Sequence, residues 1–398
     1  MRYKSTIRAA SAIAASRRCA LTWNAHANLN TLFHNTVRTM TNSAVWVDTD
    51  CGFDDLCGLS LLQDYSSDSA SKIVYVSTVN GMTDPFTGAG VINKILHLSE
   101  CSLDIACGAD SLSGQKHSIS EANWGLDYKN SFSRFVEQHL QTNQDTSIHT
   151  LNSEQSECGQ YSSLDDLILR ISDLDKGVKV TLLCLGPLTN IAYVIKKYPE
   201  IFAERVDRMI LMGGAVLAKG NAPGNAEYNF YMDPESASFA LQNCKVPIVM
   251  VGLEVANDEA ISADQLLELR SAIRCGRNEE LKEASPSNKV EPLKDEKGND
   301  TVASGNIPSN IKEFLRELIL YNKDAASYDP IACYYLICPE AFTFQLTNIT
   351  IDSQTGCTTV VLSTIEDKEE QPHEIVAVNL ATALCKTSYF IYLLSTLK

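Results

Sequence analysis

The chain has 398 residues, of which 44% are hydrophobic and 21% are charged, as in an ordinary globular protein. That length suits one large α/β domain or two smaller ones. The formal net charge of −16 argues against nucleic acid or an anionic membrane surface as the main partner, because both are polyanions. The sequence contains no run of 18 apolar residues, so it predicts no membrane-spanning helix. We therefore expect a small-molecule ligand, with no nucleic-acid or membrane partner.

The N-terminal head differs in composition from the rest of the chain. The first 47 residues contain no Asp or Glu, and residues 1–40 carry six basic side chains among many Ser and Ala. This is typical of a mitochondrial transit peptide. Alternatively, translation starts at Met40, so that the head is an upstream extension and the protein is cytoplasmic. We therefore expect a mitochondrial or cytoplasmic protein, and thirteen cysteines without a C-x-x-C pair agree with a reducing compartment.

Residues 41–398 predict one α/β domain. Apolar runs predict strands, with helical patterns between them, at residues 44–47, 73–79, 178–185, 206–212 and 246–253. This alternation predicts an open, mostly parallel sheet with helices on both faces. Further runs at 344–351, 357–362 and 375–380, followed by a helix at 381–397, predict a small antiparallel extension. Polar segments at about 110–163 and 276–309 are expected to be surface insertions.

Four aspartates follow the first predicted strand within the run DTDCGFDD: Asp48, Asp50, Asp54 and Asp55. The carboxyl end of such a strand is where open α/β sheets bind ligands. Close carboxylates repel one another, and a hard divalent cation with oxygen ligands offsets that repulsion. An EF-hand does not fit, because its loop needs Gly one position later than Gly52. A solvated helix start is the alternative explanation for these acids.

Two later segments carry polar side chains that suit a sugar. After the strand at 206–212 and a Gly-Gly pair come Asn221, then Glu227-Tyr228-Asn229, then Asp233-Pro234, which supply two amides and two carboxylates. Such groups exchange hydrogen bonds with vicinal hydroxyls, although a polar surface loop would have the same composition. Asp329 precedes Pro330 and an apolar helix, which also fits a simple helix cap. Parallel-strand topology brings these segments to the edge that carries the Asp cluster.

The order of these motifs resembles the nucleoside hydrolase family. The matching segments are DTDCGFDD, GPLTN at 186–190, MGGA at 212–215 followed by Asn221, EYN at 227–229, Asp233-Pro234 and the late Asp-Pro at 329–330. The resemblance covers about residues 44–395. It implies Ca²⁺-dependent hydrolysis of the N-glycosidic bond of ribonucleosides, in which a Ca²⁺-bound water attacks C1′ and releases base and ribose. We also expect a homo-oligomer.

The resemblance also implies roles for individual residues. Asp50 would be the catalytic general base and a metal ligand. The other metal ligands would be Asp55, Asp329 and the backbone carbonyl of Leu185. Ribose would be bound by Asp54, Asn221, Glu227 and Asn229. These residue types suit the reaction, because carboxylates stabilise an oxocarbenium-like transition state and a metal lowers the pKa of its bound water.

One departure from the family pattern concerns the base. Members of the inosine–uridine type carry His before the late Asp, and this chain has Tyr328 there. The departure resembles the purine-specific branch, in which aromatic side chains sandwich the purine. Tyr328, Tyr228 and Trp124 are the candidates for that sandwich, so purine nucleosides are the expected substrates. The loop at Asn80-Gly81-Met82 also lacks the family's usual Gly-Asn.

Two alternatives remain open from the sequence. An aspartyl phosphatase also places a D-x-D at a strand end, and it would require Mg²⁺ and release phosphate. A catalytically inactive protein that binds a nucleoside or calcium would keep the same acidic pocket without turnover.

Overall fold

The computed structural model describes eleven stretches of the chain: residues 44–66, 72–98, 103–108, 125–140, 161–175, 177–257, 260–284, 293–294, 300–301, 308–361 and 375–397. The basic head (residues 1–40) and Trp124 lie outside the described residues. None of the helices described there has the length and apolar character needed to cross a bilayer.

The described residues form one ten-stranded sheet in the order β11-β10-β12-β7-β6-β5-β1-β2-β3-β4. The strands are β1 (Ala44–Thr49), β2 (Lys72–Thr78), β3 (Asp104–Cys107), β4 (Ser162–Ser163), β5 (Val180–Cys184), β6 (Val206–Met212), β7 (Ile248–Val251), β10 (Phe342–Ile351), β11 (Thr358–Val360) and β12 (Val376–Leu384). Pairing is parallel from β12 to β4, and β10 runs antiparallel to β11 and β12. This confirms the mostly parallel sheet with a small antiparallel extension.

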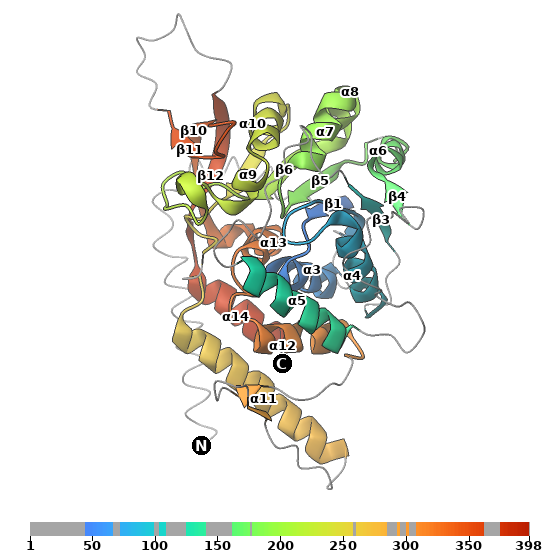
Figure 1. The fold of residues 1–398 in the computed structure, drawn as a ribbon, viewed down its shortest axis with the longest axis vertical. Coiled ribbons are helices and arrows are strands. Elements are labelled where there is room, and N and C mark those ends of the chain that lie inside the picture. The colour runs from blue at the N-terminus through green and yellow to red at the C-terminus, as the bar shows by residue number, and fades with distance from the viewer. Residues whose placement is uncertain are drawn as a thin grey trace, which may run out of the picture.

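Helices cover both faces of the sheet (Figure 1). One face carries α3 (Phe53–Ser66), α4 (Pro85–Leu98), α5 (Gly125–His139), α11 (Ala263–Ala284), α12 (Ile311–Tyr321), α13 (Asp329–Ile337) and α14 (Lys386–Thr396). The other carries α6 (Leu164–Ser172), α7 (Thr189–Lys197), α8 (Pro199–Arg205) and α10 (Pro234–Asn243). Side chains of β1 alternate between the two faces of the sheet, so this strand contributes to the core on each face. Val45 and Val47 lie in the core on the α3 face, and Trp46 lies in the core on the α7 face.

Short elements complete the described chain. They are the helix α9 (Tyr228–Met232), the 3-10 turns η4 (Pro223–Asn225) and η5 (Pro339–Ala341), and a separate hairpin of β8 (Leu293–Lys294) and β9 (Asp300–Thr301).

Two expectations from the sequence were wrong. The predicted helix at 381–397 begins only at Lys386, because the ladder between β12 and β10 continues until Leu384 pairs with Phe342. The polar segment 110–163 is not all surface, because α5 lies within it and buries Phe132 and Phe135 in the core. A helix with one apolar stripe needs few apolar residues, which explains why the composition suggested an insertion.

The strand order reverses at β1, which pairs with β2 on one side and with β5 on the other. Crevices at such reversal points, beyond the carboxyl ends of the strands, are the usual ligand sites of open α/β sheets. The acidic turn between β1 and α3 lies at this point.

Candidate active site

The turn between β1 and α3 is held by its own side chains and amides. Cys51 adopts a left-handed backbone conformation with φ of 62°. The Thr49 hydroxyl donates a hydrogen bond to one oxygen of Asp55, and the Gly52 N–H donates to the other at 2.8 Å. Asp55 is thereby fixed at the start of α3, where the helix dipole favours a negative charge.

Asp50 is held by the loop that follows β2. The Met82 N–H donates to Asp50 Oδ2 at 2.9 Å, and the Thr83 N–H donates to the Asp50 carbonyl at 3.1 Å. A Cβ at Gly81 would lie 2.0 Å from Asp50 Oδ2, so this close approach requires glycine. The loop fixes Asp50 through backbone atoms, and the Met82 side chain is left to line the cavity.

Asp48, the first aspartate of the motif, is bound by side chains of β2 and α7. Its carboxylate accepts a hydrogen bond from Asn190 Nδ2 at 2.7 Å and another from the Ser77 hydroxyl. Asn190 is the last residue of the GPLTN turn, and its amide also reaches the carbonyl of Thr78 at 3.1 Å. Asp48 therefore ties β1, β2 and α7 together beneath the site.

Three carboxylates form a group that can hold a metal ion. One oxygen each from Asp54, Asp55 and Asp329 lie within 4.8 Å of one another. Burial raises the pKa of all three and of Asp50, and repulsion between these charges raises the pKa of Asp50, Asp54 and Asp329 further. A cation would relieve both effects, and an all-oxygen donor set suits Ca²⁺ or Mg²⁺. The residues present therefore fit a hard divalent metal.

The structure places the expected metal ligands close together. Asp54, which was expected to bind ribose, is one of the three grouped carboxylates, whereas Asp50, which was expected to bind the metal, is not. The Asp50 carboxyl lies within hydrogen-bonding reach of Asp55 but outside the 4.8 Å group. The Leu185 carbonyl lines the same cavity and accepts a hydrogen bond from Asn229 Nδ2 at 3.0 Å. A carbonyl oxygen has two lone pairs, so a second partner remains available to it.

The second polar segment folds into a wall of the cavity. Glu227 precedes α9, and its carboxylate accepts hydrogen bonds from the N–H groups of Gly214 at 3.0 Å and Asn229 at 2.9 Å. Burial nevertheless raises the pKa of Glu227 to about 7. Asn221 Oδ1 accepts from the Tyr228 N–H at 2.9 Å. Glu227 and Asn229 are therefore buried in this wall, whereas Asn221 lies on an exposed loop at its edge.

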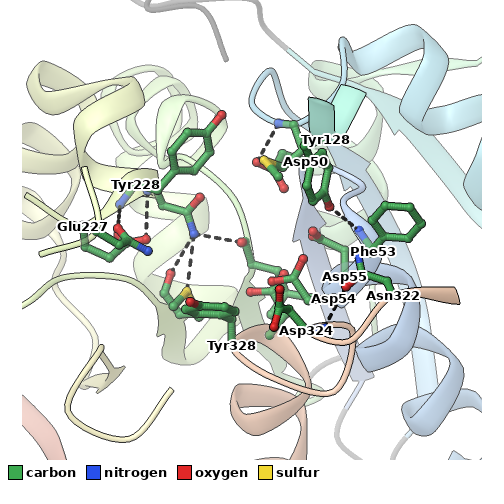
Figure 2. A pocket seen from close by; sticks show the side chains of 16 residues that line it. Asp50, Phe53, Asp54, Asp55, Tyr128, Glu227, Tyr228, Asn322, Asp324 and Tyr328 are labelled. Atoms are coloured by element: carbon green, nitrogen blue, oxygen red, sulfur yellow. Dashed lines mark hydrogen bonds between the residues drawn. The ribbon is translucent and has the colours of Figure 1, made fainter. Parts of the chain in front are cut away.

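These groups surround a cavity of about 330 Å³ (Figure 2). It is lined by the candidate residues Asp50, Asp54, Asp55, Leu185, Asn221, Glu227, Tyr228, Asn229, Tyr328 and Asp329. Six further lining residues had not been expected: Phe53, Met82, Tyr128, Met212, Asn322 and Asp324. Tyr128 lies four residues after Trp124, which had been the expected aromatic residue of this segment. Asn322 and Asp324 carry no motif.

Tyr128 brings α5 to the cavity. Its phenol oxygen accepts a hydrogen bond from the Phe53 N–H at 2.6 Å, and the two rings meet edge to face with centroids 5.2 Å apart. Tyr128 and Met82 also pack against the buried Tyr228 from the opposite wall. The lining of the cavity therefore combines aromatic and apolar side chains with carboxylates.

The fold and the site define an α/β protein with a carboxylate-rich cavity at the carboxyl ends of its parallel strands, whose oxygen ligands suit a divalent cation. A family model described as inosine-uridine preferring nucleoside hydrolase matches residues 45–386, and the chain belongs to that family. This confirms the resemblance found in the motifs.

Individual relatives agree with this assignment. The chain is 31% identical over 205 residues to the non-specific ribonucleoside hydrolase RihC of Klebsiella pneumoniae, covering 50% of this chain and 56% of that protein. It is 42% identical over 98 residues to RihC of Salmonella agona, covering 25% and 31%. These matches thus span about half or less of the length of the curated relatives.

Solved structures share the fold. An Inosine-Guanosine Nucleoside Hydrolase superposes with a TM-score of 0.65 at 19% identity, covering 89% of this chain and 98% of that one. A Purine-Preferring Ribonucleoside Hydrolase from Gardnerella vaginalis gives 0.59 at 18% identity, with the same coverage. At these identities the likeness concerns the fold alone.

Proposed function

We propose that this protein hydrolyses the N-glycosidic bond of ribonucleosides, with purine nucleosides preferred and Ca²⁺ as its metal. The observation that carries the proposal is the group of Asp54, Asp55 and Asp329 beside Asp50 in one cavity. Family membership and the relatives, which are named as nucleoside hydrolases, support the same reaction.

The metal would be held by Asp55, Asp329 and the Leu185 carbonyl, with Asp50 or Asp54 as a further ligand. When bound, such an ion polarises a water molecule and lowers its pKa. Ca²⁺ accepts six to eight oxygens in irregular geometry, whereas Mg²⁺ demands a near-ideal octahedron. A site of side-chain and backbone oxygens from three separate segments therefore favours Ca²⁺.

We assign Asp50 as the general base that accepts the proton of the attacking water. The Met82 N–H fixes one of its oxygens at 2.9 Å, so the carboxylate is oriented before substrate arrives. Asp54, Asn221, Glu227 and Asn229 would bind the ribose hydroxyls. The negative charge of these carboxylates would stabilise the positive charge that develops at C1′ as the bond to the base breaks.

The base would lie between aromatic side chains. Tyr228 and Tyr328 line the cavity, and Tyr128 joins them in place of Trp124, which is outside the described residues. An aromatic pair contributes about 0.5–1.5 kcal/mol beyond the buried area, and a larger purine ring gains more of this contact than a pyrimidine. This supports the purine preference.

A phosphatase fits the cavity poorly. Phosphate recognition uses Arg, Lys or a cluster of backbone amides directed at the anion. Among the described residues that line the cavity, none is Arg, Lys or His. The amides of Gly52, Gly214 and Met82 already donate to the carboxylates of the chain itself.

The test is ribose release measured by a reducing-sugar assay with inosine, guanosine, adenosine, uridine and cytidine. The protein is first treated with chelator and then supplied with Ca²⁺, Mg²⁺ or no metal. We expect release from the purine nucleosides to be fastest and to be restored best by Ca²⁺. Equal rates for uridine and inosine would overturn the purine preference. Nucleoside binding in calorimetry without ribose release would favour an inactive binding protein.

A further inference from the structure

The loop between β6 and α9 brings Asn221 to the edge of the cavity with little packing of its own. We call residues 216–222 the rim loop. Leu217 is 62% exposed, and Lys219 and Asn221 are exposed beside it. A loop with few buried apolar contacts opens easily unless hydrogen bonds fix its backbone. The position of Asn221 therefore depends on the hydrogen bonds that the rim loop makes.

Glu254 supplies the acceptor for three consecutive amides of the rim loop. Its Oε1 accepts hydrogen bonds from the N–H groups of Val216 at 2.7 Å, Leu217 at 2.6 Å and Ala218 at 3.2 Å. Consecutive N–H groups that converge on one anion form a nest, and hydrogen bonds to a carboxylate are stronger than those between neutral groups. One side chain therefore fixes the backbone at the start of the rim loop.

Glu254 is itself held at the end of the neighbouring strand. It lies in the turn that follows β7, and the Leu253 N–H of this turn donates to the Gly214 carbonyl at 3.0 Å. A Cβ at Gly252 would lie 2.4 Å from Glu254 Oε2 and 2.8 Å from the Gly214 carbonyl oxygen, so this close approach requires glycine. Because β6 and β7 pair directly, the sheet fixes both ends of the contact between Glu254 and the rim loop.

The order in the rim loop extends to Asn221. Asn221 Oδ1 accepts a hydrogen bond from the Tyr228 N–H at 2.9 Å, and the next residue, Ala222, donates its N–H to the Ala226 carbonyl at 3.0 Å. The first bond uses the oxygen of the Asn221 amide, so the nitrogen has two N–H donors for a hydroxyl of a ligand. Glu254 does not line the cavity, so it affects a ligand only through the rim loop.

We propose that Glu254 is a positioning residue, which holds the rim loop so that Asn221 can bind a hydroxyl of the sugar. The proposal rests on the proposed hydrolysis of ribonucleosides and adds to it a residue outside the cavity. Without Glu254, the rim loop would become ordered only when substrate binds, and this ordering costs conformational entropy. Proton transfer at Asp50 does not depend on the rim loop. The loss should therefore appear in KM more than in kcat.

The first experiment measures the rim loop without any substrate. Amide hydrogen exchange of residues 214–222 is followed by mass spectrometry in the wild-type protein, Glu254→Ala and Glu254→Gln. Alanine removes the acceptor, so exchange of the three bonded amides should become at least about tenfold faster. Glutamine keeps an acceptor oxygen without the charge, so its exchange should lie between the two. Unchanged exchange in Glu254→Ala would overturn the proposal. Equal acceleration in α7 would also overturn it, because Glu254 would then support the whole fold.

The second experiment tests whether Glu254 acts through Asn221. Glu254→Ala should raise KM for inosine by about tenfold and change kcat by less than about threefold. In an Asn221→Ala background, the same change should alter KM by less than about twofold, because the group that Glu254 positions is already gone. An equal rise of KM in both backgrounds would overturn the proposal.

The matched control for both experiments is Glu268→Ala, the same change at an exposed position on α11. It should keep the wild-type exchange of the rim loop and the wild-type KM. Failure of the proposed function is a different result, because it would appear as no ribose release from any nucleoside by the wild-type protein. The exchange measurement would still show whether Glu254 holds the rim loop.

Discussion

Backbone amides orient the acidic residues of the site. Asp50 is held by the Met82 N–H, Asp55 by the Gly52 N–H, and Glu227 by the Gly214 and Asn229 N–H groups. An amide is positioned by the strand or turn that carries it and has no rotamer to lose. These carboxylates are therefore fixed without a neutralising side chain, which leaves their charge available to a metal and a substrate.

The pH dependence of stability should report the burial of Glu227. Its pKa rises from an ordinary value of 4.5 to about 7 in the folded protein, so the folded state holds this proton more tightly than the unfolded state. The stabilising effect is complete below about pH 4.5 and is lost as pH rises through 7.

Urea unfolding of wild-type protein and Glu227→Gln, both with chelator, measures this effect. The free energy of unfolding of wild type relative to the variant should fall by up to about 3 kcal/mol between pH 4.5 and 8. Glutamine does not titrate, so the variant is the reference. A difference that is constant with pH would contradict the burial of an ionisable Glu227.

Tyr128 links α5 to the first amide of α3. Tyr128→Phe removes the acceptor of the Phe53 N–H and should lower the free energy of unfolding by about 1–3 kcal/mol, the cost of an unsatisfied buried donor. Denaturant unfolding checks this, with Tyr65→Phe, at an exposed tyrosine, expected to stay within about 0.5 kcal/mol of wild type. Equal stability of both variants would show that the hydrogen bond is absent.

At the residue level, sequence predicted the acids better than the aromatic residues. Asp50, Asp54, Asp55 and Asp329 lie on short motifs at the ends of elements, so their local context identifies them. Tyr128 and Asp324 reach the cavity only because α5 and the loop after α12 pack against α3, and that contact leaves no local pattern. Asp48 shares the motif but faces Asn190, which its position in the sequence did not reveal.

At the level of elements, α5 belongs to the core and to the site. Phe135 is fully buried, and its ring lies 5.5 Å from Phe53 and 5.8 Å from Phe314, measured between centroids. The helix therefore packs against α3 and α12, which both carry or precede residues of the cavity. Displacing α5 would loosen the cavity as well as the core.

Phe135→Ala should lower the free energy of unfolding by about 3–5 kcal/mol, because it leaves a large void between α5, α3 and α12. Phe86→Ala is the control, since Phe86 is 41% exposed and loses less contact. The two midpoints in urea measure the difference. Similar losses for both variants would mean that α5 does not pack as described.

Long elements with a regular pattern were the easiest to predict. The strand Val206–Met212 was found at its predicted bounds, whereas β12 continues to Leu384 because its partner β10 is long enough to pair with it. The apolar residues at 381–384 suit either a strand or a helix, and only the pairing decides between them. Boundaries set by a distant partner cannot be read from local pattern.

For the whole molecule, metal binding should contribute to stability. Burial raises the pKa of Asp54, Asp55 and Asp329, and repulsion raises the pKa of Asp54 and Asp329 further, so a cation in this group stabilises the folded state over the unfolded chain. Saturating Ca²⁺ at 100 times its dissociation constant should add about 2.7 kcal/mol and raise the melting temperature. Asp329→Asn should lose most of this rise. A rise of equal size in both proteins would place the metal elsewhere.

The whole-molecule predictions from composition remain predictions. The head at residues 1–40 and Trp124 lie outside the described residues, and the homo-oligomer and the mitochondrial or cytoplasmic location rest on the sequence alone. The parallel sheet, in contrast, followed from alternating apolar patterns, because each crossover helix forces its neighbouring strands to run the same way.

The most direct test of the proposed hydrolase is ribose release from inosine by wild-type protein and by Asp50→Asn, at saturating Ca²⁺. The matched control is Asp264→Asn, the same change at an exposed position on α11. Loss of the group that accepts the proton of water should lower kcat by about 10²–10⁴-fold, while the melting temperature stays near that of wild type. The control should retain wild-type kcat. If Asp50→Asn stays folded and retains kcat within about threefold of wild type, Asp50 is not the base and the account of this cavity is wrong.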